Sequence, residues 1–223
     1  MAIFDNEALE YDKWYSTKLG ALVDEVETAL SFKLIEPQKD MKILDFGCGT
    51  GNYSIKLAES GCLVTGMDIS KKMLDIAEKK AEKSDLNIKF VYSESLKLPF
   101  KEETFDAALS IVTFDFIENS NNYFDEIFRV VKSGGRIVIG VINKDSSWGK
   151  LYQSEYFQND SVFKYAHFFG KEDLKNIKKE NLVEMGESLF FPPDTKEEEL
   201  SIELERKLSN KNEGGFICGL WIK

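Results

Sequence analysis

The stretch KILDFGCGTGNYSIKLAES, residues 42–60, decides the fold of this chain of 223 residues. It starts with a short apolar run, passes through Gly47, Gly49 and Gly51, and continues into a helical pattern. An apolar run that ends at glycine is typical of a buried strand. Because glycine has no Cβ, a ligand can approach its backbone closely. The stretch therefore predicts a strand, a ligand-binding turn and a helix, in that order.

The rest of the chain continues this alternation. Helices are predicted within residues 1–35 and between successive strands, and the strands are predicted at 41–46, 62–68, 87–92, 105–112, 134–142, 187–193 and 214–223. Strands that alternate with helices indicate βαβ units and a mostly parallel sheet covered by helices on both faces. No repeat or linker interrupts the pattern, so we expect one α/β domain spanning residues 1–223 with a helical cap at residues 1–35.

The composition limits the possible partners and the cellular compartment. The net charge of −10 argues against a nucleic-acid partner, which would need clustered Lys and Arg. No apolar run approaches the roughly 20 residues needed to span a bilayer, and the charged N-terminus does not resemble a signal peptide. Cys48, Cys62 and Cys218 lack the spacing of a metal site. We expect a cytoplasmic protein with no membrane partner and no metal, acting on a neutral or cationic small molecule.

The glycine turn itself reduces the number of ligand classes that fit the sequence. Its pattern is GxGxG, and Asn52 stands where the dinucleotide fingerprint GxGxxG has its third glycine. The lysine of a P-loop is also missing. Asp68 ends the second predicted strand, where a carboxylate accepts hydrogen bonds from ribose hydroxyls in dinucleotide folds. The alternative for Asp68 is a helix or turn cap. The pattern favours an adenosine ligand without a pyrophosphate.

An ordered series of motifs follows. ILDFGCGTG, VTGMDIS, SESLKLPF, FDAALSIVTFDFIEN and VVKSGGRIVIG occur in this order over residues 41–142. The series resembles the class I S-adenosylmethionine-dependent methyltransferases, and most closely the group that contains the ubiquinone and menaquinone biosynthesis methyltransferases. The resemblance implies a Rossmann-like three-layer sandwich with a seven-stranded, mostly parallel sheet whose last strand is antiparallel. It also implies S-adenosylmethionine as the cofactor.

The resemblance implies roles for individual residues. The turn would hold the methionine part of the cofactor, Asp68 would bind the ribose, and the segment SESLKLPF would face the adenine. The cofactor-binding residues implied in this way are Asp45, Gly47, Cys48, Gly49, Gly51, Asp68, Ile69, Glu94, Ser95 and Ser110, with Tyr11 and Tyr15 reaching the methionine carboxylate from the N-terminal cap.

Residues outside these motifs would select the methyl acceptor. Asp115 is the candidate general base, although it could equally cap a turn. His167, the only histidine, is expected to be structural. Residues 145–170 are rich in aromatic side chains and form either a lid over the acceptor or part of the core.

We expect a methyltransferase that acts on a small-molecule acceptor by in-line displacement, a reaction that can depend largely on positioning. Two alternatives stay open at this point. One is a non-catalytic S-adenosylmethionine-binding or regulatory protein, and the other is an NAD-dependent oxidoreductase. The sequence does not indicate the identity of the acceptor or the oligomeric state.

Overall fold

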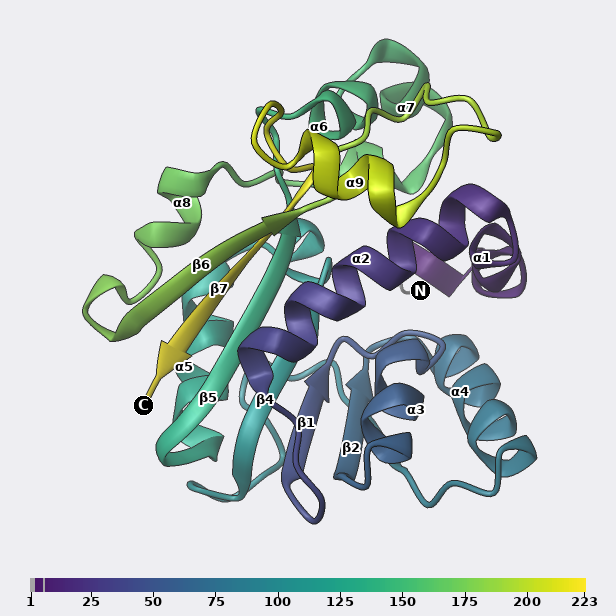
Figure 1. The fold of residues 1–223 in the computed structure, drawn as a ribbon. Helices are drawn as coiled ribbons and strands as arrows, with labels where there is room; N and C mark the ends of the chain where they lie inside the picture. Colours follow the sequence, from purple (N-terminus) through teal and green to yellow (C-terminus); the bar gives the residue numbers. More distant parts are fainter. Residues whose placement is uncertain (1–2, 6) are drawn as a thin grey trace.

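One seven-stranded sheet organises the molecule. The computed structural model describes residues 3–5 and 7–223, and in it the strands lie in the order β3-β2-β1-β4-β5-β7-β6 (Figure 1). The strands are β1 (Lys42–Phe46), β2 (Leu63–Asp68), β3 (Lys89–Tyr92), β4 (Phe105–Ile111), β5 (Val131–Ile142), β6 (Leu182–Ser188) and β7 (Phe216–Ile222). β7 runs antiparallel to both of its neighbours, while β1 to β5 pair in parallel. The predicted fold class is confirmed.

Helices and short 3-10 turns fill the connections. They are η1 (Ile3–Asp5), α1 (Ala8–Tyr15), α2 (Lys18–Ile35), α3 (Asn52–Glu59), α4 (Lys71–Lys83), η2 (Phe114–Phe116), α5 (Ser120–Val130), α6 (Ser147–Tyr152), α7 (Glu155–Asp160), η3 (Val162–Tyr165), α8 (Lys171–Lys175), η4 (Lys179–Asn181) and α9 (Ile202–Leu208). None of the helices within the described ranges is long and apolar enough to cross a membrane.

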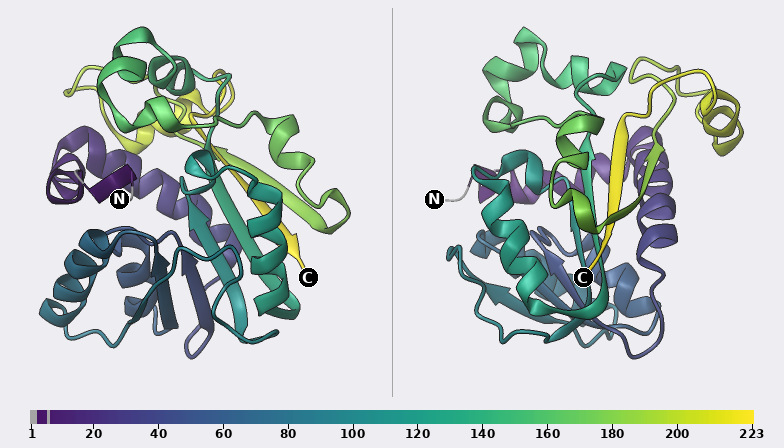
Figure 2. Two further views of the ribbon diagram at one scale, coloured as in Figure 1. Left: turned by 180° about the vertical axis from the view of Figure 1, so that it is seen from behind. Right: turned by 90° about the vertical axis from the view of Figure 1, so that its left-hand side faces the viewer.

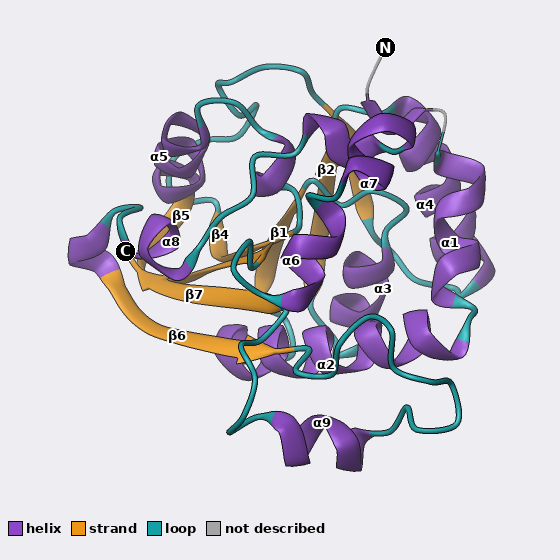
Figure 3. Ribbon diagram, turned by 90° about the horizontal axis from the view of Figure 1, so that it is seen from above, coloured by secondary structure: helices purple, strands orange, loops and turns teal. Residues whose placement is uncertain are grey.

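The sheet separates two hydrophobic cores. Successive side chains of a strand point to opposite faces, so Ile43 packs in one core and Leu44 in the other, and both are fully buried. α2 and α3 supply apolar side chains to the first core, and α5 and α8 supply them to the second. Figures 2 and 3 show α2 on one side of the sheet and α5 and α8 on the other. Burial on both faces explains why β1 and β4 read as continuous apolar runs.

The predicted strand at 187–193 was placed too late in the chain. β6 ends at Ser188 because Leu189 has a left-handed φ of 65°, which turns the chain out of the sheet. The Glu205 carboxylate then accepts hydrogen bonds from the backbone N–H groups of Leu189 (2.6 Å), Phe190 (2.7 Å) and Phe191 (3.3 Å). The charged composition of α9 predicts an exposed helix, but Glu205 is buried and binds the chain that leaves β6.

The parallel strands β1, β2 and β4 end at the same edge of the sheet. Figure 1 shows α1 and the α6–α7 segment beyond the carboxyl ends of β1, β2 and β4. α2 reaches this end with its first turns and runs down the sheet with the remainder. In open parallel sheets this end is the usual place of a ligand.

Trp221 should be one of the larger contributors to folding stability. The side chain is fully buried beside Phe124, and its indole N–H donates to the Ile177 carbonyl at 2.7 Å. Trp221→Ala should therefore lower the free energy of unfolding by about 3–5 kcal/mol. Chemical denaturation would measure the loss. Val183→Ala, at a 64% exposed position on the adjacent strand, is the control, and similar losses in the two variants would contradict the prediction.

Candidate active site

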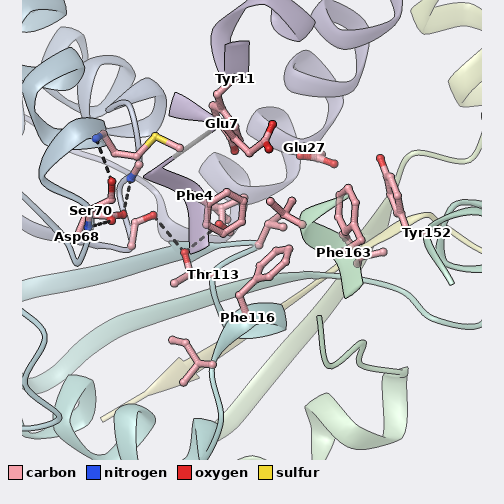
Figure 4. Close-up of a pocket in the computed structure, with 18 of the residues that line it drawn as sticks. Phe4, Glu7, Tyr11, Glu27, Asp68, Ser70, Thr113, Phe116, Tyr152 and Phe163 are labelled. Atoms are coloured by element: carbon pink, nitrogen blue, oxygen red, sulfur yellow. Dashed lines mark hydrogen bonds between the residues drawn. The ribbon is translucent and has the colours of Figure 1, made fainter. Parts of the chain in front are cut away.

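A large pocket opens beyond the carboxyl ends of the strands. Its volume is about 970 Å³, and residues from the N-terminal helices, the glycine turn, the end of β2 and the loop after β4 line it (Figure 4). The α6–η3 region closes the opposite side through Tyr152, Phe157 and Phe163. A second cavity of about 50 Å³ lies behind the glycine turn and shares Tyr11, Tyr15, Gly47 and Gly49 with the large pocket. The pocket is large enough for a nucleoside ligand together with a second molecule.

The glycine turn has a backbone that other residues adopt only with strain. Gly47, Gly49 and Gly51 have φ values of 73°, 52° and 80°, all left-handed. A Cβ on Gly47 would lie 2.2 Å from the Thr113 side chain. The N–H groups of Gly47 and Cys48 both donate to the Met67 carbonyl, at 2.8 and 3.0 Å. These contacts hold the turn against the end of β2 and leave Gly49 with open space beside it.

Asp68 connects the turn to the next helix. One carboxylate oxygen accepts from the Gly49 N–H at 2.9 Å, and the other accepts from the Ser70 N–H at 2.8 Å. Each oxygen retains a lone pair for a ligand, and Asp68 lines the large pocket together with the half-exposed Ile69. Burial raises the pKa of Asp68, and the two backbone N–H donors oppose that rise. The Asp68 carboxylate is therefore well placed to accept hydrogen bonds from ligand hydroxyls.

Asp45 lies deeper, in the wall of the smaller cavity. It is 2% exposed and accepts a hydrogen bond from the Ser54 hydroxyl at 2.5 Å. Burial raises the pKa of Asp45 to about 7. Cys48 lines the same cavity, and burial raises the pKa of its thiol well above the usual range. Both residues stand behind the turn, at the end of the pocket nearest to α1.

The N-terminal helix α1 is attached to the glycine turn by a polar network that the sequence did not reveal. The Asp12 carboxylate accepts from the Thr50 hydroxyl at 2.7 Å, from the Asn52 amide at 3.3 Å and from the Lys80 ammonium at 2.9 Å. Lys80 also donates to the Asn52 side chain. The only sequence signal was the pair of polar residues, Thr50 and Asn52, inside a glycine-rich turn. The network places α1 over the pocket.

Two tyrosines of α1 face the pocket as the sequence suggested. The Tyr11 and Tyr15 hydroxyls are 3.3 Å apart, and both side chains line the large pocket and the small cavity. Burial raises the pKa of each phenol, so both remain neutral donors at physiological pH. Trp14 lines the large pocket beside them. The pair lies near the glycine turn and can donate to an anionic group held there.

Four residues that the resemblance implied do not line either cavity. Glu94 and Ser95 are exposed, and Glu94 accepts a hydrogen bond from the Tyr92 hydroxyl, while their neighbour Leu96 lines the pocket. Ser110 is buried and donates to the Phe46 carbonyl at 2.9 Å, which fastens β4 to β1. Gly51 lies at the N-cap of α3, next to Ala77. These residues support the site from behind or at its edge.

Asp115 does not face the pocket, so the geometry does not support the base role suggested for it. Its side chain is fully buried, and one oxygen accepts from the Ile142 N–H at 3.2 Å, while the other has no hydrogen-bond partner among the residues that the structure describes. Burial raises the pKa of Asp115 well above its ordinary value. The next residue, Phe116, lines the pocket instead. His167 is likewise absent from the pocket wall, and its backbone N–H donates to the Asp115 carbonyl at 2.6 Å.

Glu27 is a pocket residue that the sequence analysis missed. It projects from α2 into the large pocket, between Tyr11 and Tyr152 in Figure 4. Its carboxylate has no ion pair or hydrogen bond with any residue that the structure describes. Burial, together with repulsion from Asp24, raises its pKa to about 8, and Lys56 opposes the rise. The signal in the sequence was its position eight residues after Leu19 and four after Val23, on the apolar face of the helix.

Gly47→Ala should destabilise the protein more than the same change at another left-handed glycine. Gly134 has a φ of 76° with nothing within 4 Å of an added Cβ, so it controls for backbone strain alone. Each alanine should cost about 1–2 kcal/mol for its left-handed backbone. Gly47→Ala carries an additional clash with Thr113, and chemical denaturation should show a larger loss. Equal losses would contradict the close contact between the turn and Thr113.

Glu27→Gln should stabilise the folded chain increasingly as the pH rises from about 4.5 to about 8. In this range the folded state retains a proton on Glu27 that the unfolded state has lost, so the wild type loses stability with rising pH. Glutamine cannot ionise and avoids that loss. Denaturation curves at several pH values would measure the difference. Glu25→Gln, at an exposed position of α2, controls for removing a charge, and a difference between Glu27→Gln and wild type that does not change with pH would contradict the prediction.

Comparisons with known proteins identify the family of this chain. Residues 44–139 match the family described as "Methyltransferase domain". An uncharacterised protein of Methanocaldococcus jannaschii is 33% identical over 98% of this chain and 97% of its own length. A demethylmenaquinone methyltransferase of Lactococcus lactis is 31% identical over 97% of this chain and 86% of its own length.

A solved structure extends the comparison to the fold. A protein of Thermotoga maritima, described as a SAM-dependent methyltransferase and possible histamine N-methyltransferase, has a TM-score of 0.73 with 24% identity, covering 99% of this chain and 98% of that one. It has the same fold over almost the whole length. The chain therefore belongs to the class I S-adenosylmethionine-dependent methyltransferases, resembles their menaquinone-biosynthesis group, and has S-adenosylmethionine as its cofactor.

Proposed function

We propose that this protein transfers the methyl group of S-adenosylmethionine to a small-molecule acceptor by in-line displacement, with residues 1–223 acting as one methyltransferase domain. One observation carries the proposal. A single pocket runs from the glycine turn and Asp68 to the aromatic side chains of 152–163, so donor and acceptor can lie in the same enclosed space.

The residues present fit the cofactor. Asp68 has free lone pairs that can accept the ribose hydroxyls. The glycine turn has no Cβ facing the ligand at Gly49, and Tyr11 and Tyr15 stand near it as neutral donors for a carboxylate. Ile69 and Leu96 are exposed apolar side chains in the pocket wall beside Asp68, which suits an adenine ring. When bound, the cofactor supplies an electrophilic methyl group on a sulfonium.

The charge of the pocket also suits this donor. Glu7, Glu27, Asp68 and Glu118 line the pocket, and no Lys, Arg or His of the described residues does. A phosphate-bearing cofactor would meet repulsion from these carboxylates, whereas a sulfonium is attracted. This electrostatic preference supports S-adenosylmethionine over a nicotinamide dinucleotide.

The chemistry requires mainly positioning and exclusion of water. An in-line displacement at a methyl group needs the acceptor atom aligned opposite the leaving sulfur, and holding both partners in one pocket supplies that alignment. The aromatic walls remove water from the acceptor. We propose that α1 and residues 145–170 enclose the acceptor side, because Trp14, Tyr152, Phe157 and Phe163 come from these segments.

Ligand-induced stabilisation tests the donor. S-adenosylmethionine and S-adenosylhomocysteine at about 100 times their Kd should each add roughly 2.7 kcal/mol to the free energy of unfolding, and NAD should add nothing. Thermal or chemical unfolding with the three ligands side by side measures the effect. Stabilisation by NAD alone would overturn the proposal.

Asp68→Ala should weaken binding of S-adenosylmethionine by at least about tenfold, because two charge-assisted hydrogen bonds to the ribose would be lost. Isothermal titration would measure the Kd, with the unfolding curve recorded to show that the variant folds. Asp75→Ala, at an exposed position of α4, is the matched control. Unchanged affinity in Asp68→Ala would remove the ribose assignment. Formation of S-adenosylhomocysteine in a metabolite extract would separate an enzyme from a binding protein.

A further inference from the structure

We propose that the acceptor is a cationic amine, and that the Glu27 carboxylate pairs with its ammonium group and takes its proton before methyl transfer. This inference rests on the proposed methyltransferase function and names the class of acceptor for the same pocket. It assigns a role to a half-buried carboxylate of the pocket wall.

The first argument is that Glu27 lacks a partner of its own. Lys56 acts on Glu27 electrostatically, but its ammonium group is bound to the Asp24 carboxylate at 2.5 Å and to the Thr28 hydroxyl at 2.7 Å. Glu27 makes no ion pair or side-chain hydrogen bond within residues 3–5 and 7–223. A carboxylate without a partner in a largely apolar pocket destabilises the protein. A cationic ligand would remove this cost on binding.

The wall of the pocket as a whole is acidic. The four carboxylates of its wall have no basic residue among the described lining residues to balance them. An acceptor that carries a phosphate or carboxylate would be repelled. A neutral phenol or quinol can donate a hydrogen bond to Glu27 but leaves the negative charge of its carboxylate uncompensated. An amine satisfies the charge balance, because it enters as the cation that the pocket lacks.

The third argument is the aromatic wall around Glu27. Phe4 and Phe116 meet edge to face with ring centroids 4.8 Å apart, and Tyr152 stacks on Phe163 at 4.1 Å. Figure 4 shows these rings around the space into which Glu27 points. Aromatic faces attract cations, and the attraction grows when water is excluded. Carboxylate and rings together form a site for an alkylammonium or arylalkylammonium group.

The position of Glu27 separates it from the cofactor contacts. Its charge acts on Tyr11 and Tyr15, near the glycine turn, and on Tyr152 of α6, on the acceptor side. Glu27 therefore lies at the boundary between donor and acceptor, where the reacting nitrogen must also lie. Asp68, at the other end of the pocket wall, serves the ribose.

The proposed reaction consists of a proton transfer followed by a methyl transfer. The ammonium nitrogen gives one proton to the Glu27 carboxylate and becomes a neutral amine. Its lone pair forms the new N–C bond to the methyl group, while the S–C bond breaks and its electron pair stays on sulfur. The products are the methylated ammonium and S-adenosylhomocysteine, with the proton on Glu27 lost to solvent on release. A carboxylate whose pKa is raised by burial is a suitable proton acceptor for this step.

The titration of Glu27 depends on several neighbouring groups. Asp24 of α2 and Lys56 of α3 change the pKa of Glu27. Glu27 in turn raises the pKa of groups on the elements packed around it, which are Tyr53 of α3, Tyr11 and Tyr15 of α1, Tyr152 of α6, Asp115 of η2 and Cys218 of β7. Burial is the main cause that raises the pKa of Glu27 to about 8, repulsion from Asp24 adds to it, and Lys56, the single cation among these groups, opposes the rise.

Matched pairs of amines and alcohols test the proposal. The probes are 2-phenylethylamine with 2-phenylethanol, and tryptamine with tryptophol, titrated into the protein saturated with S-adenosylhomocysteine. Each amine should bind at least about tenfold more tightly than its alcohol, as expected for a charge-assisted contact. Amine affinity should rise as the pH approaches about 8 in the wild type. With S-adenosylmethionine in place of the product, only the amines should yield S-adenosylhomocysteine.

Glu27→Gln should lower amine affinity at least about tenfold and abolish its rise with pH. It should lower the affinity for S-adenosylmethionine much less, because Glu27 is only one of four carboxylates in the pocket wall. Glu25→Gln is the control for charge removal on the same helix. Equal binding of amine and alcohol, failure of both amines to bind, or unchanged amine affinity in Glu27→Gln would overturn the proposal. A parallel loss of S-adenosylmethionine binding in Glu27→Gln would also overturn it, since Glu27 would then serve the donor.

Failure of the methyltransferase function and failure of the amine assignment give different results in these experiments. If S-adenosylmethionine does not bind the wild-type protein, the methyltransferase function itself fails. If it binds, but methyl transfer favours neutral or anionic acceptors, only the assignment of Glu27 and of the amine class fails.

Discussion

The pairing of β1 with β2 is the contact on which the site depends. Parallel pairing in the register Phe46↔Met67 brings the Met67 carbonyl under the N–H groups of Gly47 and Cys48. It also places Asp68 one residue further on, within 2.9 Å of the Gly49 N–H. The left-handed turn is thus stabilised because its N–H groups donate to the end of the neighbouring strand. The Asp68 carboxylate, which also accepts from the turn, faces the pocket. A change of register would remove both the turn and the ligand contact.

The pocket and the small cavity behind the glycine turn contain acidic groups whose charged forms the folded protein alone does not stabilise. Asp45 and Glu27 are both carboxylates whose pKa is raised by burial, to about 7 and about 8. Such groups reduce folding stability, since each disfavours its charged form in the native state. Sites that bind ligands commonly retain this kind of unfavourable electrostatics. The acidic pocket therefore has a physical preference for cationic ligands before any one is bound, and a sulfonium donor fits that preference.

Most of the fold and half of the site were predictable from the sequence, and the failures have physical causes. Strands buried on both faces give apolar runs that are read directly, so six of the seven strands were placed correctly and only β6 was displaced. The turn and Asp68 were predictable because their chemistry is local to a strand end. The two roles left open for Asp115 could not be separated, because a carboxylate after a strand can face either the ligand or the core, and local sequence does not distinguish the two.

The sequence by itself determined the strand–turn–helix unit and the alternation of strands and helices, because these depend on residues close together in the chain. The methyl donor was implied by the resemblance of an ordered series of motifs to a known family. The tertiary structure alone decided which carboxylates share the pocket. Asp12 binds Thr50 and Lys80, and Glu27 shares the pocket with Tyr152, across sequence separations that no local pattern spans. Whether a charged side chain is buried, paired or left without a partner depends on which distant elements pack around it, and that is settled only when the sheet and its helices assemble.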